Sequence, residues 1–228
     1  MLYRTPAYRI MGDRSLLVEL GDHIGLDVNQ RVRELFVALK ANELKGIVEI
    51  IPGYSSLLVV FDPFKTHLSV LQKEVQHTLD VLDPSRLIEP KTVEIPVAYG
   101  GEFGPDLTWV AQYHNITPEE VIRLHTSRVY HVYMIGFTPG FPYMGELPKA
   151  LVTPRKETPR TVVPKGSVAM AQAQTGIYPT QSPGGWQIIG RTPIDLFDAS
   201  KWPPALLQMG DQVRFFAIDE KDMAQWQQ

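Results

Sequence analysis

One histidine in the sequence is a candidate for proton transfer. His125 shares the apolar face of a predicted helix with Val121 and Leu124. An imidazole titrates near neutral pH, so His125 could act as a general acid or base, or as a ligand donor. The structural alternative is a core histidine held by hydrogen bonds, and the sequence leaves both interpretations open.

A basic segment is a candidate for anion binding. Residues 136–193 carry six basic side chains and two acidic ones, whereas the whole chain has a net charge of −3. Such a segment in an acidic protein favours attraction of a small anion, a carboxylate or a phosphate. The alternative is a solvated cluster of charges.

The stretch GFTPGFPYMGELP, residues 136–148, combines three glycines, three prolines and three aromatic residues. Pro139 and Pro142 exclude a regular helix and disfavour a central strand. Aromatic residues are uncommon in disordered linkers, so we expect a rigid, shaped loop. The alternative is a structural corner that packs its rings into a core.

Familiar nucleotide and metal motifs do not fit. Lys165-Gly166-Ser167 has the wrong order for a P-loop, and GGEFG at 100–104 has the wrong spacing for a dinucleotide fingerprint. The six histidines are scattered, and no HExxH pattern occurs. We therefore expect no metal in this chain.

The N-terminal part reads as an α+β unit. Strands are predicted at 15–20, 47–51 and 56–61. A helix capped by Asp27 carries an apolar stripe from Val28 to Leu39, and a second helix runs from Leu68 to Leu82. This pattern predicts an α+β unit of the ferredoxin-like type over residues 1–84.

A linker with two prolines, Asp83 to Lys91, separates this unit from a second domain over 91–228. Strands are predicted at 92–99, 129–135 and 213–218, and Thr117 caps the helix that carries His125. Short strands with many Gly/Pro turns indicate a β-barrel or a sandwich.

Composition bounds the function. The chain has 228 residues, no cysteine and a net charge of −3. Thiolate chemistry and disulfides are excluded, and a general nucleic-acid binder is disfavoured. No apolar run is long enough for a signal peptide or a membrane span, so we expect a cytoplasmic protein that binds neither nucleic acid nor membrane.

Several long motifs together resemble the family of 5-oxoprolinase B subunits, also called allophanate hydrolase subunit 1 or KipI. They are GFTPGFPYMGELP, IPGYSSL, IPVAYGGEFGPDL, LHTS around His125, and residues 153–193. One departure is visible at Ala169, Ala171 and Gln172, where family members often have glycine. These larger residues would reshape the local surface and put the substrate identity in question.

The resemblance implies a cyclophilin-like β-barrel after the α+β lobe. It also implies one subunit of an ATP-dependent 5-oxoprolinase, which opens 5-oxo-L-proline to L-glutamate and is not active alone. The implied partners are the C-like and A-like subunits of that enzyme, with ATP as a substrate of the assembled complex. Two alternatives are a regulatory protein that inhibits a sensor histidine kinase and one subunit of an allophanate- or urea-metabolising enzyme.

Phosphorylating a lactam oxygen and attacking it with water requires cations and hydrogen-bond donors. Arg160 and Arg155 could bind the anionic groups, and Arg160 and His125 are the predicted catalytic residues. Further substrate-binding candidates are hydroxyl donors, glycines that permit close backbone approach, and an apolar wall: Tyr143, Thr175, Tyr178, Gly184, Gly185 and Trp186. Each has a structural alternative: a solvated arginine, a core hydroxyl, or a hairpin turn at Gly184-Gly185.

Overall fold

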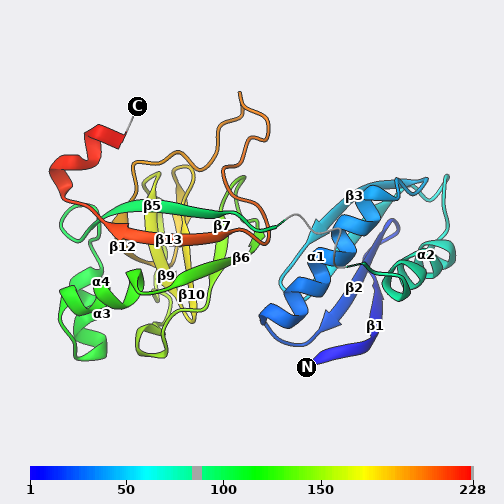
Figure 1. Ribbon diagram of the computed structural model, residues 1–228, viewed down its shortest axis with the longest axis horizontal. Coiled ribbons are helices and arrows are strands. Elements are labelled where there is room, and N and C mark those ends of the chain that lie inside the picture. The colour runs from blue at the N-terminus through cyan, green and yellow to red at the C-terminus, as the bar shows by residue number, and fades with distance from the viewer. Residues whose placement is uncertain (84–88, 227–228) are drawn as a thin grey trace. The chain divides into compact units, whose positions relative to one another are not determined.

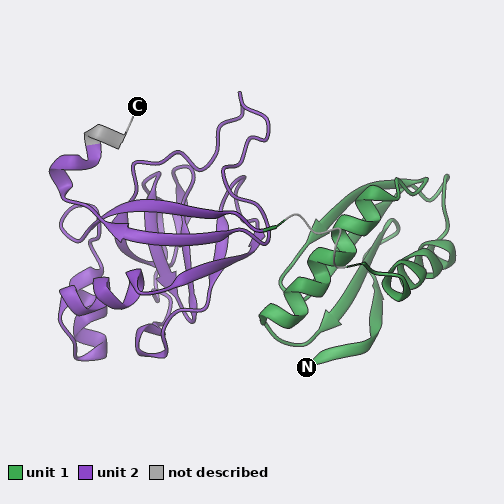
Figure 2. Cartoon of the chain, in the orientation of Figure 1, with its two compact units in different colours: residues 1–89 green, residues 90–228 purple. Residues whose placement is uncertain are grey.

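The computed structural model describes residues 1–83 and 89–226, and it divides into two compact units, Met1–Glu89 and Pro90–Gln228 (Figures 1 and 2). Most of the predicted linker, residues 84–88, lies outside the described residues. Each unit has its own buried core, so each is described by itself.

Unit 1 is a four-stranded antiparallel sheet packed against two helices. Its elements in chain order are β1 (Leu2–Ile10), β2 (Ser15–Gly21), α1 (Leu26–Ala41), β3 (Ile47–Pro52), β4 (Ser56–Phe61) and α2 (Leu68–Asp80). The strand order is β1-β2-β4-β3. Alternate residues of β2, namely Leu16, Val18 and Leu20, are buried, as the two-residue period of a half-covered sheet requires.

The sequence located these elements well, with two exceptions in unit 1. The helix α1 begins at Leu26 with Gly25 as its N-cap, so Asp27 lies in the first turn and does not cap the helix. A carboxylate there still favours the positive end of the helix dipole. Strand β1 had no sequence prediction, because its apolar residues do not alternate clearly.

Unit 2 is a closed barrel of seven strands in the order β10-β7-β6-β13-β5-β12-β9 (Figure 1). The barrel strands are β5 (Thr92–Tyr99), β6 (Val129–Ile135), β7 (Pro142–Gly145), β9 (Ser167–Ala171), β10 (Gln174–Ile177), β12 (Gln187–Arg191) and β13 (Gln212–Ala217). Of the two open sequence alternatives, barrel and sandwich, the barrel is correct. Strand β13 pairs in parallel with β5, and the other barrel pairs are antiparallel.

Two helices, a separate two-stranded sheet and two short 3-10 turns complete unit 2. The helices α3 (Leu107–His114) and α4 (Pro118–Thr126) pack together at one end of the barrel, and β8 (Arg160–Val163) pairs with β11 (Ser182–Gly184) in a separate two-stranded sheet. The Thr117 hydroxyl accepts a hydrogen bond from the Glu120 N–H, which confirms the predicted helix cap. Short 3-10 turns lie at Lys149–Leu151 and Glu220–Trp226.

The expectation that residues 136–148 contain no central strand is wrong for their second half. Residues Pro142–Gly145 form β7, which lies between β6 and β10 in the barrel. Pro142 is the first residue of the strand, where a missing backbone donor costs least. The loop prediction is correct for the residues before it.

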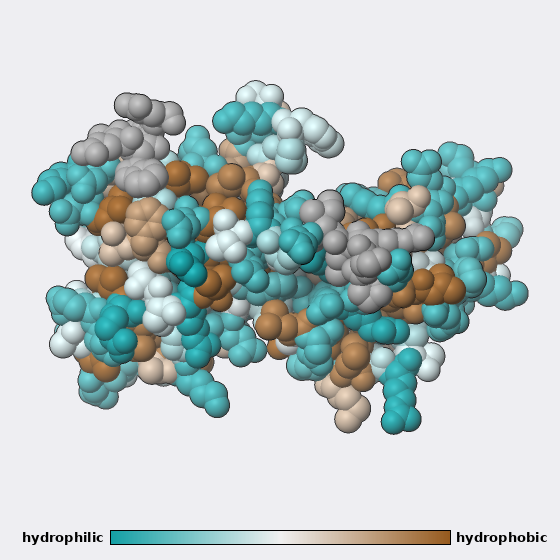
Figure 3. All heavy atoms as spheres, viewed as in Figure 1, coloured by the Kyte–Doolittle hydropathy of each residue, from teal (hydrophilic) through white to brown (hydrophobic). Residues whose placement is uncertain are grey.

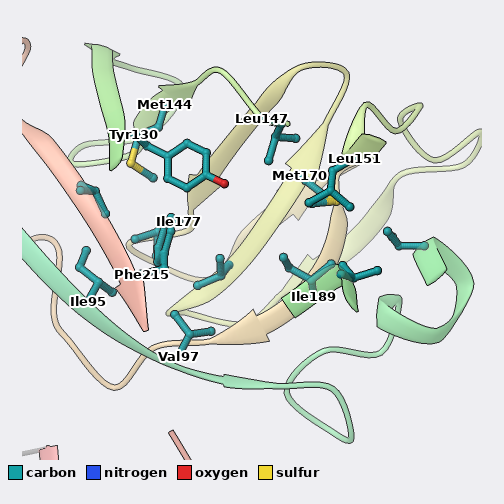
Figure 4. Close-up of a cluster of buried hydrophobic side chains, with 14 of the residues drawn as sticks. Ile95, Val97, Tyr130, Met144, Leu147, Leu151, Met170, Ile177, Ile189 and Phe215 are labelled. Carbon is teal, nitrogen blue, oxygen red and sulfur yellow. The ribbon is translucent and has the colours of Figure 1, made fainter. Parts of the chain in front are cut away.

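Strand β9 is buried on both faces and separates two apolar clusters. Val168 and Met170 belong to the main core, which fills the barrel and extends to α3 and α4 (Figure 4). Ala169 and Ala171 belong to a second cluster on the other face of the strand. That second cluster, defined by Phe141, Val163, Ala169, Ala171, Tyr178, Trp186 and Ile188, is called the aromatic cluster below.

Candidate functional site

The predicted site residues fall into two groups in the structure. His125 and Thr175 are fully buried and hydrogen-bonded to one another. The other candidates gather around the aromatic cluster: Tyr143, Arg155, Arg160, Tyr178, Gly184, Gly185 and Trp186. The two groups lie on opposite faces of β9, because Thr175 is paired with Met170 and the aromatic cluster contains Ala169 and Ala171.

His125 has the contacts of a neutral core histidine. Its Nδ1 lies 2.8 Å from the Tyr99 hydroxyl, and its Nε2 lies 2.9 Å from the Thr175 hydroxyl. The imidazole also packs against Phe215, with ring centroids 4.7 Å apart. Burial lowers the pKa of His125 from 6.5 to about 3, so the ring carries no charge at neutral pH. This geometry favours the structural alternative over proton transfer to a substrate.

Thr175 acts in the same buried network. Its hydroxyl contacts the His125 ring and lies 3.2 Å from the Ala169 carbonyl oxygen, to which it donates. The Thr175 hydroxyl has one hydrogen and donates it to the Ala169 carbonyl, so it must accept from His125. His125 Nε2 is therefore the protonated nitrogen, and Nδ1 accepts from the Tyr99 hydroxyl. The network therefore selects one tautomer and leaves no donor for a ligand.

The aromatic cluster is held by ring contacts that are edge-to-face for Phe141 with Tyr178 and Trp186 and tilted for Phe141 with Tyr143. Phe141 contacts Tyr143, Tyr178 and Trp186 with centroid separations of 4.8, 5.1 and 5.6 Å. Such contacts fix ring orientation beyond what burial alone provides. Phe137, from the loop before β7, also meets Tyr178 edge-on and remains 58% exposed. The stretch from 136 to 148 therefore supplies both the wall and the rim of this cluster.

The positive charge of Arg155 acts on the hydroxyls of both Tyr143 and Tyr178, and that of Arg160 acts on Tyr178 as well. Burial raises the pKa of Tyr143 and Tyr178, and the positive charge of Arg155 opposes that rise at both hydroxyls. Both phenols therefore stay protonated at neutral pH and can donate hydrogen bonds. No ion pair joins Arg155 to a carboxylate in the described part of the chain.

Arg160 forms an ion pair with Asp106, a carboxylate that the sequence analysis did not single out. Its Nη2 donates to Asp106 Oδ1 over 2.7 Å, and the Lys156 ammonium lies 3.3 Å from the same oxygen. The other oxygen, Oδ2, accepts from the Ile188 N–H at 2.7 Å. Burial would raise the pKa of Asp106, but the Arg160 hydrogen bond and charge, the Ile188 N–H and Lys156 together lower it. Arg160 is thus not the solvated arginine of the structural alternative.

Asp106 was missed because nothing local marks it. It follows Pro105 and precedes α3, which reads as an ordinary helix start, and its partner Arg160 is 54 residues away. Asp106 is hydrogen-bonded to Ile188 of β12, whereas Arg160 begins β8, which pairs with β11, so the two meet only in the folded unit. The Nη1 of Arg160 is buried without a hydrogen-bond partner in the described structure.

The two glycines of the PGGW turn have different surroundings. A methyl group on Gly184 would collide with the Tyr178 ring and hydroxyl, whereas one on Gly185 would meet only Pro159, at 3.5 Å. The close approach at Gly184 is therefore made by Tyr178. The Gly185 carbonyl accepts from the Lys156 N–H at 2.8 Å, which anchors the segment that carries the cations.

Of the three residues that depart from the resemblance, Ala169 and Ala171 belong to this cluster and Gln172 does not. Ala169 and Ala171 are buried against its rings, so their methyl groups form part of its floor. Gln172 has a φ of 53°, a conformation that favours glycine, and its side chain is exposed.

No group of three or more His, Cys, Asp or Glu side chains is placed to hold a metal ion in the described part of the chain. Within residues 1–83 and 89–226, no helix is long and apolar enough to cross a bilayer. On the face drawn in Figure 3, apolar residues lie in small groups among polar ones.

The chain matches a known class of protein over most of its length. Residues 6–207 fit the family model described as carboxyltransferase domain, subdomain C and D, and the chain belongs to that family. Within it, the chain is similar to proteins named as the B subunit of 5-oxoprolinase. It is 41% identical over 230 residues to the one from Bacillus subtilis strain 168, covering 96% of each chain. With the one from Haemophilus influenzae it shares 48% identity over 189 residues, 82% of this chain and 87% of that one. The resemblance to this family predicted from the sequence motifs is confirmed.

A solved structure shows the same fold. TTHA0988 superposes with a TM-score of 0.82 at 37% identity over 90% of this chain. This chain spans only 40% of the length of TTHA0988, so the shared fold is part of a longer polypeptide there.

Proposed function

We propose that the chain is the B subunit of a multi-subunit 5-oxoprolinase, which uses ATP to open 5-oxo-L-proline to L-glutamate. The observation that carries this proposal is the similarity to a 5-oxoprolinase B subunit over 96% of both chains. The partners are C-like and A-like subunits of the same enzyme, and ATP is a substrate of the assembled complex.

The aromatic cluster supports binding of the substrate's carboxylate. Arg155 is a guanidinium without a carboxylate partner in the described residues, beside the protonated hydroxyls of Tyr143 and Tyr178. A guanidinium gives a carboxylate two parallel hydrogen bonds, and the phenols add neutral donors. Trp186 and Phe141 supply an apolar wall for the ring of the substrate.

Arg160 and His125 have supporting roles in this proposal. Arg160 positions the segment through Asp106, and its unpartnered Nη1 is a remaining donor close to the cluster. His125 holds β10 in place through Thr175. Neither residue is proposed to transfer a proton during the reaction.

The two units also have folds that we propose to name. We infer that unit 1 is a ferredoxin-like lobe in which the edge strand beside β2 is β1, the first strand of the chain. The support is that β2-α1-β3-β4-α2 has the strand order β2-β4-β3 of that motif, with β1 next to β2. The seven-stranded barrel is proposed to be cyclophilin-like.

Reconstitution tests the function. The purified chain alone is expected to show no ATP-dependent hydrolysis of 5-oxoproline, and mixing with its C-like and A-like partner subunits is expected to restore it. Glutamate release and ATP consumption are measured together in each mixture. Robust turnover by the single chain, or none by the full mixture, would contradict the proposal.

A role in urea or allophanate metabolism is the second candidate, favoured by the carboxyltransferase description of the family. The same reconstituted mixture, assayed with urea and allophanate in place of 5-oxoproline, separates the two. Inhibition of a sensor histidine kinase stays a prediction, to be tested by kinase autophosphorylation with and without the chain.

A further inference from the structure

Two glycine-rich segments that match no nucleotide motif line one pocket in unit 2. GGEFG at 100–104 contributes Phe103, and Lys165-Gly166-Ser167 contributes its first two residues. The pocket has a volume of about 430 Å³. The end of β12 and the turn after it, from Arg191 to Asp195, together with Met223, complete its lining. None of these residues belongs to the aromatic cluster or to the Arg155 group.

The backbone around this pocket is fixed by glycine. Gly166 has a φ of 80°, and a methyl group on it would collide with the Thr192 carbonyl. Its N–H donates to the Tyr178 carbonyl, and its carbonyl accepts from the Thr192 N–H at 2.9 Å. Lys165 is thereby held next to Arg191 and Thr192, although they are distant in the sequence.

Arg191 is the cation of this pocket. Its guanidinium lies over the Phe103 ring, 5.1 Å from the centroid, which orients the planar group. Its Nε is buried and has no hydrogen-bond partner in the described structure, and no described carboxylate forms an ion pair with it. A buried donor without a partner is costly, so a ligand that supplies an acceptor there is favoured.

The rim of the pocket adds one cation and one anion. The Lys165 ammonium lies 2.7 Å from Asp195 Oδ1, and both side chains are well exposed, 49% and 62%. Among the described lining residues the charged ones are Lys165, Arg191 and Asp195, which leaves a net charge of +1. An anion is therefore attracted, and Asp195 weakens that attraction.

We propose that this pocket binds a small oxyanion, a carboxylate or a phosphate group, with Arg191 as the bidentate donor and Lys165 at the rim. The Nε and one Nη of a guanidinium form a fork that matches two oxygens of either group. This proposal does not rest on the proposed 5-oxoprolinase activity, because none of its residues belongs to the proposed substrate site.

Binding to the purified full chain tests the proposal. Titration calorimetry with inorganic phosphate and, separately, with acetate measures each dissociation constant. Arg191→Gln is expected to weaken binding about tenfold or more, the loss of a hydrogen bond to a charged group. Arg214→Gln is the matched control, since it removes the same charge from an exposed barrel position, 56% accessible, and should leave binding unchanged.

Asp195→Asn is a second variant, and it is expected to strengthen binding, which a misfolded protein would not do. Removing the carboxylate frees Lys165, so binding is expected to tighten roughly two- to fivefold, the range for an exposed ion pair. Preference for phosphate identifies a phosphoryl-bearing ligand, and preference for acetate identifies a carboxylate. Binding of neither probe overturns the proposal. So does binding that Arg155→Gln abolishes and Arg191→Gln leaves intact, because the anion would then occupy the aromatic cluster.

Discussion

Arg160 and Asp106 form the ion pair that ties the cationic segment to the barrel, with Nη2 and Oδ1 2.7 Å apart. The Asp106 side chain is 7% exposed and the Arg160 side chain 25%, so both charges are largely removed from water. Asp106 also receives the Ile188 N–H, which fixes it to β12. The pair is therefore a structural clamp beneath the candidate site.

Asp106→Asn is expected to destabilise unit 2 by roughly 3 kcal/mol, because it leaves a partly buried arginine and Lys156 without their carboxylate. Urea unfolding followed by tryptophan fluorescence measures this change, since all four tryptophans lie in unit 2. Glu94→Gln is the control, because that carboxylate is 65% exposed and 3.9 Å from its partner. Equal small effects at both positions would show that the clamp contributes little.

The same clamp predicts a pH dependence. The folded-state pKa of Asp106 is depressed below 3.8, so its stabilising contribution is present above that pH and is lost as the pH falls through the folded pKa. Between about pH 5 and pH 2, wild type should therefore lose more unfolding free energy than Asp106→Asn. Parallel pH profiles for the two proteins would contradict this expectation.

The lowered pKa of His125 predicts a second acid-induced loss of stability, which begins at a higher pH than the loss due to Asp106. Because burial lowers its folded pKa from 6.5 to about 3, the unfolded chain binds a proton between these values and the folded chain does not. Unfolding free energy should fall as the pH drops below about 6.5, at up to about 1.4 kcal/mol per pH unit. His125→Gln should flatten that slope in fluorescence-monitored unfolding, and the exposed His77→Gln in unit 1 should not. An unchanged slope would mean that the pKa of His125 in the folded protein lies close to its value in the unfolded chain.

Arg155→Lys is expected to raise the KM for 5-oxoproline in the reconstituted complex by about tenfold or more, since lysine lacks the bidentate fork. Arg160→Lys is the comparison: it should alter the free energy of unfolding more than the KM, because its partner is Asp106. Steady-state kinetics and urea unfolding of both variants measure the two effects. The reverse assignment, with KM changed only by Arg160→Lys, would place the anion at Arg160.

Adjacent glycines give a matched test of packing. Gly184→Ala is expected to displace Tyr178 and to cost about 1–3 kcal/mol of stability, as overpacking does. Gly185→Ala should cost under about 0.5 kcal/mol, because its methyl group meets only Pro159. Melting temperatures of the two variants decide between this expectation and a flexible turn that tolerates both changes.

Regular periodicity explains which elements could be predicted from sequence. The helix stripe from Val28 to Leu39 reflects one buried face, and such a pattern is local. The apolar alternation predicted β5 as a strand, although its residues 95–98 are all buried in the barrel. Strand β7 was missed because it is four residues long and starts with proline, so its pairing partners decide its conformation. The apolar positions of β9 are buried on both sides and show no alternation.

The site was predictable only in part, for a similar reason. Residue types and family motifs brought Tyr143, Arg155, Tyr178 and Trp186 into consideration, and the structure gathers them at one cluster. The sequence could not show which side chains contact each other when they are far apart along the chain. Whether Arg160 meets a ligand or Asp106, and whether His125 meets a substrate or Thr175, depends on contacts 54 and 50 residues apart.

The parallel pairing of β13 with β5 has a consequence for synthesis. Because β13 lies between β5 and β6, two of the earliest strands of unit 2 keep unpaired edges until residues 212–217 leave the ribosome. Exposed strand edges invite pairing with other chains. The nascent barrel therefore spends most of its translation open, and it is in this interval that a chaperone or another subunit of the enzyme has the greatest influence on the yield of folded protein.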